Sequence, residues 1–170
     1  MNLSRVLNGE QKKEEVTCPF PFQSFRGEEV DSSSPLSLHI ENISKGKAVV
    51  KGSAKIWLKL SCDRCLVPVE HELLLDFSRE VYGPDYINDE IREEQFFMDG
   101  NELDVEALVD EALNLAWPVK ILCKDDCKGI CGKCGKNRNL EDCECDDFVP
   151  DVRWAGLMDI FEGKKSVKHF

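Results

Sequence analysis

The chain has 170 residues, of which 42% are hydrophobic, and its 22 basic and 33 acidic side chains give a net charge of −11. This length suits one domain, or one domain with a small appendage, and excludes two full catalytic domains. No apolar run approaches the roughly 20 residues of a membrane span. The first fifteen residues lack the apolar core of a secretory signal, so the nine cysteines are predicted to be cytoplasmic thiols, which favours metal binding over disulfides.

The first predicted elements are three strands of an antiparallel meander. Residues 36–40, 47–61 and 66–81 alternate between apolar and polar side chains with a period of two, which is typical of strands with one buried face. In the strand 47–61 the even-numbered residues, such as Ile56 and Leu58, are expected to lie in the core.

The turn between the two long strands is predicted at residues 62–65, a Cys-x2-Cys tetrapeptide. A slip by one residue would turn the apolar face to water, so the register should be well defined. Opposite charges across neighbouring strands contribute roughly 0.2–1 kcal/mol each. A four-residue turn pairs lysines with acids: Lys47 with Glu80, Lys51 with Asp76 and Lys55 with Glu72.

The excess negative charge is confined to residues 84–111, which hold 11 acids and one base. The flanking regions are nearly neutral, with 12 acids and 11 bases before this segment and 10 of each after it. Such a patch can steer a basic partner protein, and its candidate contacts are Glu90, Glu93 and Glu94. Phe96 and Phe97 could join that contact, although packing against the sheet is the more ordinary fate of two phenylalanines.

A helix is predicted after the acidic segment, because Asp104 can cap it and Pro118 stops it. A short amphipathic helix should begin at Asp151. We therefore expect an α+β fold in which residues 1–118 form a domain with an antiparallel sheet and a packed helix. Residues 119–170 form a cysteine-rich zinc-binding module with the C-terminal helix, docked on the first domain.

Eight of the nine cysteines are clustered, and residues 119–147 have too little hydrophobic content to fold by burial alone. Four thiolates complete a closed tetrahedral zinc site, so eight clustered cysteines suit up to two such sites. The more firmly predicted site uses Cys131, Cys134, Cys143 and Cys145. By elimination, the other would use Cys62, Cys65, Cys123 and Cys127.

Other interpretations of these cysteines remain open. Cys127 could replace Cys143 or Cys145 in its site, because Cys-x-Cys is a tight chelate. A structural iron–sulfur cluster or a redox-released zinc switch is also compatible with the spacing. A radical enzyme with an iron–sulfur cluster is disfavoured because only 36 residues follow Cys134.

The bases between residues 120 and 138 include Lys128, Lys133 and Lys136. They could balance the negative charge of the zinc thiolates, contact phosphate, or do both. The three histidines and the acidic residues form no constellation suited to acid–base chemistry. The sequence therefore predicts neither an enzyme nor a small-molecule substrate.

Several motifs together resemble the bacterial YceD family of large ribosomal RNA subunit accumulation proteins, which is also found in plastids. They are CDRCL at the turn, a helix ending in proline, LCKDDCKGICGKCGKNRN, CEC and PDVRWAGL. The resemblance runs from about Leu36 to Phe161. It implies a role in accumulation or processing of 23S ribosomal RNA without known catalytic activity.

Resemblance and charge together favour a cytoplasmic ribosome-biogenesis factor. Its expected partner is a precursor of the large ribosomal subunit, contacted through ribosomal RNA or a basic ribosomal protein. A zinc- or redox-responsive regulatory protein is the alternative that the same cysteines permit.

Overall fold

The computed structural model describes residues 1–145, so the helix predicted from Asp151 lies outside the part described. The chain divides into two compact units. The first comprises residues 1–63 and 67–123, and the second comprises residues 64–66 and the chain from Lys124 onward.

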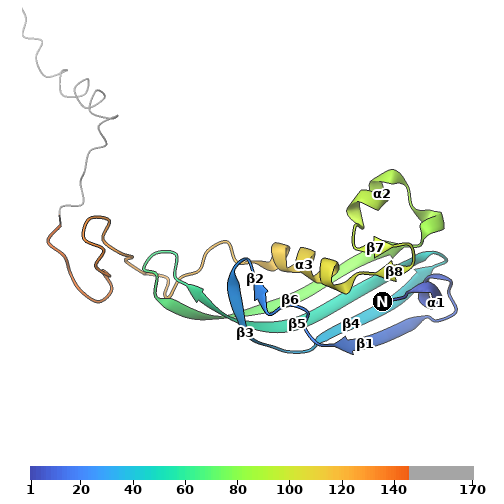
Figure 1. Ribbon diagram of the computed structural model, residues 1–170, viewed down its shortest axis with the longest axis horizontal. Coiled ribbons are helices and arrows are strands. Elements are labelled where there is room, and N and C mark those ends of the chain that lie inside the picture. Colours follow the sequence, from blue (N-terminus) through green and yellow to red (C-terminus); the bar gives the residue numbers. More distant parts are fainter. Residues whose placement is uncertain (146–170) are drawn as a thin grey trace, which may run out of the picture. The chain divides into compact units, whose positions relative to one another are not determined.

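Six strands of the first unit form one antiparallel sheet (Figure 1). They are β1 (Lys13–Cys18), β2 (Ser24–Phe25), β3 (Glu28–Ser33), β4 (Leu36–Ser44), β5 (Lys47–Ser61) and β6 (Pro68–Tyr82). Along one edge β5 pairs with the whole of β6, while along its other edge it pairs first with β4 and then with β3. The predicted meander is therefore confirmed as β4, β5 and β6.

The other elements of this unit are short except for one helix. They are α1 (Ser4–Leu7), the 3-10 helix η1 (Pro84–Tyr86), α2 (Asp89–Glu94), β7 (Met98–Asp99), β8 (Glu102–Leu103) and α3 (Val105–Ala116). The predicted cap of α3 is present, since the Asp104 carboxylate accepts a hydrogen bond of 3.1 Å from the Ala107 amide. None of the helices within residues 1–145 is long and apolar enough to cross a membrane.

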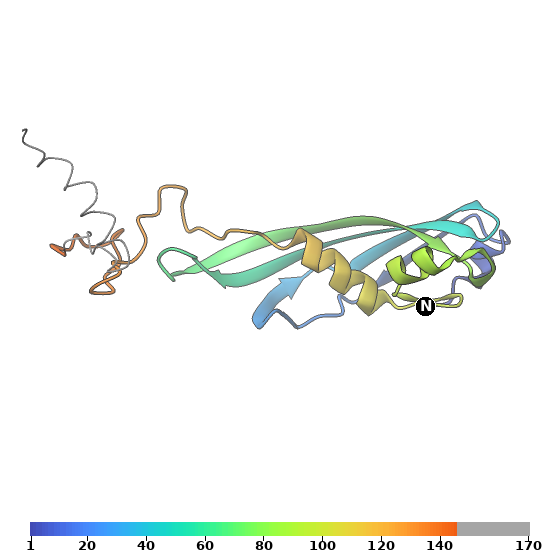
Figure 2. The same cartoon turned by 90° about the horizontal axis from the view of Figure 1, so that it is seen from above.

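The core lies on one face of the sheet, where α1, α3 and the segment that contains Phe20 and Phe22 cover it. Even-numbered residues of β5 are buried, as predicted, and Ile56 is 1% exposed. Leu108 and Leu113 of α3 are buried in the same cluster. Figure 2 shows α3 lying along the sheet beside β6. The other face of the sheet carries polar side chains, as an antiparallel sheet with one wet face does.

The predicted register of β5 and β6 is wrong by two residues. The last pair of the ladder is Ser61 and Pro68, so six residues rather than four separate the two strands. Within this turn Cys62 donates its amide to the Val67 carbonyl at 2.9 Å. The three lysines consequently lie opposite other residues: Lys47 opposite Tyr82, Lys51 opposite Ser78 and Lys55 opposite Leu74.

A shift of two residues keeps every side chain on its own face, so alternation alone cannot detect it. Two of the expected ion pairs persist diagonally, because long side chains reach the residue two positions along the neighbouring strand. Lys47 lies 2.8 Å from Glu80, and Lys55 lies 3.6 Å from Glu72. Within residues 1–145, Lys51 and Asp76 form no ion pair.

The observed register makes a testable prediction at Gly52, which lies opposite Phe77. A Cβ atom at Gly52 would lie 2.1 Å from Cζ of the Phe77 ring, which is buried. We expect Gly52→Ala to lower the free energy of unfolding by about 1–3 kcal/mol, because the overpacked ring must move. Chemical denaturation measures this change.

Gly83→Ala is the matched control, because a Cβ there would meet nothing closer than 3.7 Å. Adding Phe77→Leu to Gly52→Ala should restore part of the lost stability. If the second change only adds to the loss, Phe77 does not face Gly52 and the six-residue turn is incorrect.

Candidate metal centres

The structure gathers the eight clustered cysteines into two groups of four, each with its sulfur atoms within 4.8 Å of one another. Group one is Cys62, Cys65, Cys123 and Cys127, and group two is Cys131, Cys134, Cys143 and Cys145. In a tetrahedral site with zinc–sulfur bonds of about 2.3 Å, the sulfurs lie about 3.8 Å apart. Each group could therefore hold a metal ion, and the identity of the metal stays a prediction.

The ninth cysteine belongs to neither group. Cys18 is half-buried at the end of β1, packs against the hydrophobic core and places its sulfur 3.9 Å from the Leu36 carbonyl oxygen. It serves as a small hydrophobic side chain.

In the first unit, Asp63 positions the chain that leads to Cys123. The Asp63 amide donates to the Ile121 carbonyl at 2.9 Å, and the Asp63 carboxylate accepts from the Ile121 amide at 2.6 Å. These two bonds bring a segment after α3 to the residue that follows Cys62. Asp63 was not predicted to have a role, although it lies between the two turn cysteines.

In the second unit, Arg64 holds the backbone around Cys127. Its guanidinium donates to the Cys127 carbonyl at 2.8 Å, and its own carbonyl accepts from the Ile130 amide at 3.0 Å. Gly129 allows this close approach, because its φ is +76° and a Cβ there would lie 3.0 Å from the Arg64 oxygen. Arg64 therefore contributes to the cysteine module rather than to the sheet.

Asn139 is a second residue that sequence reasoning missed. Its side-chain amide donates to the Cys127 sulfur at 3.3 Å, while its side-chain oxygen accepts from the Lys128 amide at 2.9 Å. The side chain of Asn137 in turn accepts from both nitrogens of Asn139. An N–H donated to a thiolate stabilises its negative charge and orients it toward a metal. The signal in the sequence is the Asn-Arg-Asn triplet at residues 137–139, which closely follows the Cys-x2-Cys motif at residues 131–134.

We therefore predict that Asn139→Ala weakens metal binding at group one by about 10- to 100-fold, the range for lost outer hydrogen bonds to metal ligands. Competition with a chelator measures the affinity of the purified full chain. Asn8→Ala is the control, because Asn8 is exposed and caps the C-terminal end of α1, far from the cysteines in the sequence. This variant should bind the metal with unchanged affinity. Equal affinities in the two variants would remove Asn139 from the metal site.

Group two is built on a tight turn. Cys131 donates its amide to the Lys136 carbonyl at 2.8 Å, and Gly135 donates back to the Cys131 carbonyl at 2.9 Å. Gly135 has a φ of +74°, which favours glycine at this position. Cys131 is buried and Cys134 is exposed, so one side of the group faces solvent.

The thiols of group two have different proton affinities. Backbone N–H groups of Cys134 and Lys133 lower the pKa of Cys131 to about 6. The neighbouring Cys134 side chain, followed by burial, raises the pKa of Cys145 to about 11. At neutral pH the metal-free group therefore has a thiolate at Cys131 and a protonated thiol at Cys145.

Metal binding at group two should consequently strengthen as pH rises. A metal must displace the proton of Cys145 throughout the range from pH 6 to pH 8, whereas Cys131 loses its proton near the lower limit. We expect the affinity for zinc to rise about tenfold or more from pH 7 to pH 8, measured by chelator competition. An affinity that does not change with pH would mean that Cys145 is not a ligand.

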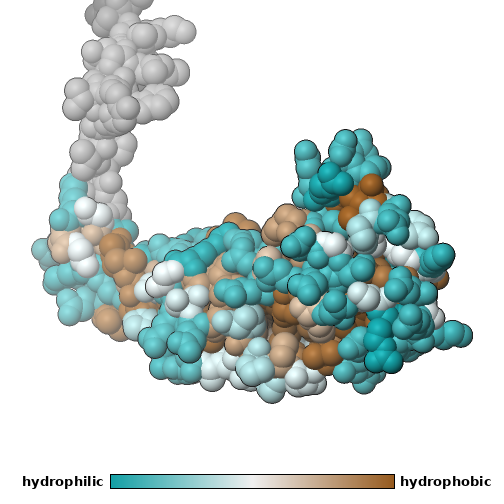
Figure 3. Space-filling view, turned by 45° about the vertical axis from the view of Figure 1, so that its right-hand side comes forward, coloured by the Kyte–Doolittle hydropathy of each residue, from teal (hydrophilic) through white to brown (hydrophobic). Residues whose placement is uncertain are grey.

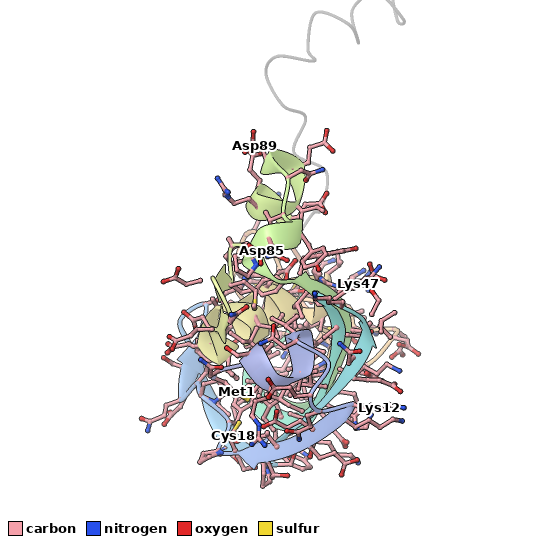
Figure 4. All side chains as sticks on the ribbon, turned by 90° about the vertical axis from the view of Figure 1, so that its right-hand side faces the viewer. Met1, Lys12, Cys18, Lys47, Asp85 and Asp89 are labelled. Carbon is pink, nitrogen blue, oxygen red and sulfur yellow. The ribbon has the colours of Figure 1, made fainter. Side chains whose placement is uncertain are left out.

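The predicted partner residues lie on separate units. Glu90, Glu93 and Glu94 are exposed on α2 and form no ion pair within residues 1–145. Figure 4 shows this projecting segment, with Asp85 and Asp89 labelled on it. In the second unit Lys128, Lys133 and Lys136 are exposed, and Lys136 pairs with Glu141 at 3.1 Å.

Comparisons with known proteins identify a family and several relatives. A family model described as "Large ribosomal RNA subunit accumulation protein YceD" matches residues 50–161. An uncharacterized protein of Mycobacterium tuberculosis strain H37Rv is 29% identical over 127 residues, covering 74% of this chain and 60% of the relative. One of Mycobacterium leprae is 26% identical over 129 residues, covering 74% and 58%.

A plant relative carries a functional name. An Arabidopsis thaliana protein named "Large ribosomal RNA subunit accumulation protein YCED homolog 1, chloroplastic" is 23% identical over 158 residues, covering 76% of this chain and 49% of the relative. This chain thus spans between about half and three fifths of the length of these relatives. No solved structure matches it.

Proposed function

Because the chain belongs to the YceD family, we propose that it is a non-enzymatic, cytoplasmic ribosome-biogenesis factor that supports accumulation of 23S ribosomal RNA. The match to the family model over residues 50–161 carries this proposal. The printed name of the plant relative, a large ribosomal RNA subunit accumulation protein, supports it. The proposed partner is a precursor of the large ribosomal subunit.

The proposed ion is zinc, at one or two sites per chain. Four thiolates are the donor set of structural zinc sites, which carry no open position for substrate. In the described residues 124–145, the buried side chains are Cys127 and Cys131. Zinc would therefore supply the ordering free energy that a hydrophobic core supplies elsewhere.

The acidic helix α2 supports contact with a basic ribosomal protein. Three carboxylates on one exposed helix, which form no ion pair in the described part of the chain, attract a cationic partner. The attraction is screened over a Debye length of about 8 Å at 0.15 M ionic strength. Contact with ribosomal RNA would instead use the lysines of the cysteine module, because phosphate needs positive charge.

Two triple variants test this proposal. Changing Glu90, Glu93 and Glu94 to Gln should weaken cosedimentation with large-subunit precursors, most strongly at low salt, without unfolding the protein. The matched control changes three exposed acids outside the segment, Glu10, Glu29 and Glu70, to Gln and should bind normally. Treatment with RNase should not abolish binding to the basic protein.

The contrary result is equally specific. If the α2 variant cosediments unchanged across a salt series and changing Lys128, Lys133 and Lys136 to Gln abolishes binding, the contact is made with RNA. If no variant and no wild-type preparation cosediments with large-subunit precursors, the proposed role in ribosome biogenesis is wrong.

A further inference from the structure

The most exposed aromatic ring next to α2 is fixed in place by its two neighbours. Phe96 is 61% exposed, whereas Gln95 and Phe97 are only 4% and 1% exposed. The Gln95 side chain accepts from the Tyr82 amide at 3.0 Å and donates to the Tyr82 carbonyl at 3.1 Å. The Phe96 ring rests edge-on against Phe97, with 5.5 Å between ring centroids. Phe96 is therefore held out of the core by buried residues on both sides.

An open groove of about 470 Å³ lies beside this ring, between β6, the segment of α2 and α3. Ile91, Tyr82 and Phe97 contribute apolar surface to it. Figure 3 shows hydrophobic surface on this projecting part of the molecule, surrounded by hydrophilic residues. Apolar and charged side chains therefore both line the groove.

Four acids and a single base line the groove, and two of the acids have no ion-pair partner within residues 1–145. Arg79 binds Glu111 with two contacts of 3.2 Å each. Glu80 is occupied by Lys47 and the Tyr82 hydroxyl, both at 2.8 Å. Glu93 and Glu94 form no ion pair with any residue in the described chain. Both line the groove together with Phe96.

We propose that this groove binds an arginine side chain from a basic segment of a partner protein, with the guanidinium stacked on Phe96 and paired with Glu93 or Glu94. The proposal rests on the proposed function in that the partner is a basic protein. It adds that the recognised residue is an arginine and that the Phe96 side chain recognises it.

Arginine fits this site better than lysine. A guanidinium is planar, stacks on aromatic rings and pairs with a carboxylate through two N–H groups, whereas an ammonium is a compact, strongly hydrated charge. The chain itself uses both arrangements. Arg26 lies 5.7 Å from the ring centroids of Phe25 and Trp117, and Arg79 holds Glu111 with two contacts.

Charge complementarity also favours a basic protein over a nucleic acid or a second copy of this chain. A nucleic acid would bring phosphates toward unpaired carboxylates, which is unfavourable. A second copy of the chain would bring one acidic segment of 11 acids and one base against another. A cationic segment of another protein is the occupant whose charge complements Glu93 and Glu94.

The test compares two labelled peptides with the full, metal-loaded chain by fluorescence anisotropy. One contains arginine, serine and glycine in repeats, and the other replaces each arginine by lysine. We expect the arginine peptide to bind about 3- to 30-fold more tightly, the range of a cation–π contact. Phe96→Ala should remove this preference, Phe96→Trp should keep it, and Leu115→Ala, which changes an exposed apolar residue of α3, should not affect it.

Two results with the peptides would overturn the inference: equal affinities of both peptides for the wild type, or an undiminished arginine preference in Phe96→Ala. It would also be overturned if Phe96→Ala weakened dimerisation or RNA binding and left peptide binding unchanged. A failed proposed function gives a different pattern. In that case the arginine preference depends on Phe96, but the protein does not cosediment with large-subunit precursors. Cosedimentation without any arginine preference removes the inference alone.

Discussion

Replacing Cys131 by serine is expected to release one metal ion per chain and to disorder residues 131–145, while the β5–β6 sheet stays folded. Cys131 is the buried member of group two, and its backbone closes the turn through Lys136. Structural zinc sites contribute about 10–16 kcal/mol of apparent binding free energy. No hydrophobic cluster in this segment can replace that contribution, since its one buried side chain is Cys131. Elemental analysis measures the metal content, and amide hydrogen exchange locates the disorder.

Cys18→Ser is the matched control, because Cys18 lies outside both groups. It should keep the full metal content and the protection of residues 131–145. If Cys131→Ser keeps its metal, a different set of cysteines binds the ion. If the wild type contains no metal and the segment is ordered by disulfides, the zinc proposal and the prediction of cytoplasmic thiols both fail. A metal-free form that still binds precursors would show that zinc has no part in binding.

Phe97→Ala should lower the free energy of unfolding by about 3–5 kcal/mol, the usual cost of removing a buried phenylalanine side chain. Phe97 is 1% exposed and belongs to the core cluster that also contains Leu103 and Leu108. Its backbone carbonyl also accepts a hydrogen bond of 2.8 Å from the Asp104 amide, immediately before α3. Truncation therefore leaves a cavity beside the start of that helix. Urea denaturation followed by circular dichroism measures the change.

Phe96→Ala provides the control at the adjacent position. The same truncation there removes a ring that is 61% exposed, so the free energy of unfolding should change by less than about 0.5 kcal/mol. Similar losses at both positions would mean that the two rings are buried alike, and the groove beside Phe96 would then not exist as described.

Sequence alone determined the three longest strands, the helix α3 and their buried faces. Alternation with a period of two predicted β4, β5 and β6 and buried the even-numbered residues of β5, because hydrophobic burial selects one face of a strand. Asp104 and Pro118 bounded α3 because capping and the missing proline N–H are local effects. Cysteine spacing predicted that Cys62 lies near Cys65 and that Cys131 lies near Cys134, since a Cys-x2-Cys turn brings two sulfurs together by itself. The assignment of the remaining four cysteines to metal sites stays a prediction.

Tertiary structure decided whatever depends on distances between segments. The register of β5 against β6 differs by two residues from the prediction, because a shift of two leaves burial unchanged and the length of the turn selects between the alternatives. Two adjacent phenylalanines are equivalent in sequence, and only their packing shows that Phe97 is buried in the core cluster while Phe96 is exposed. The contacts of Arg64 and Asn139 with Cys127 likewise could not be predicted from the sequence. Hydrogen bonds to a backbone carbonyl or a sulfur leave no periodic pattern in the sequence.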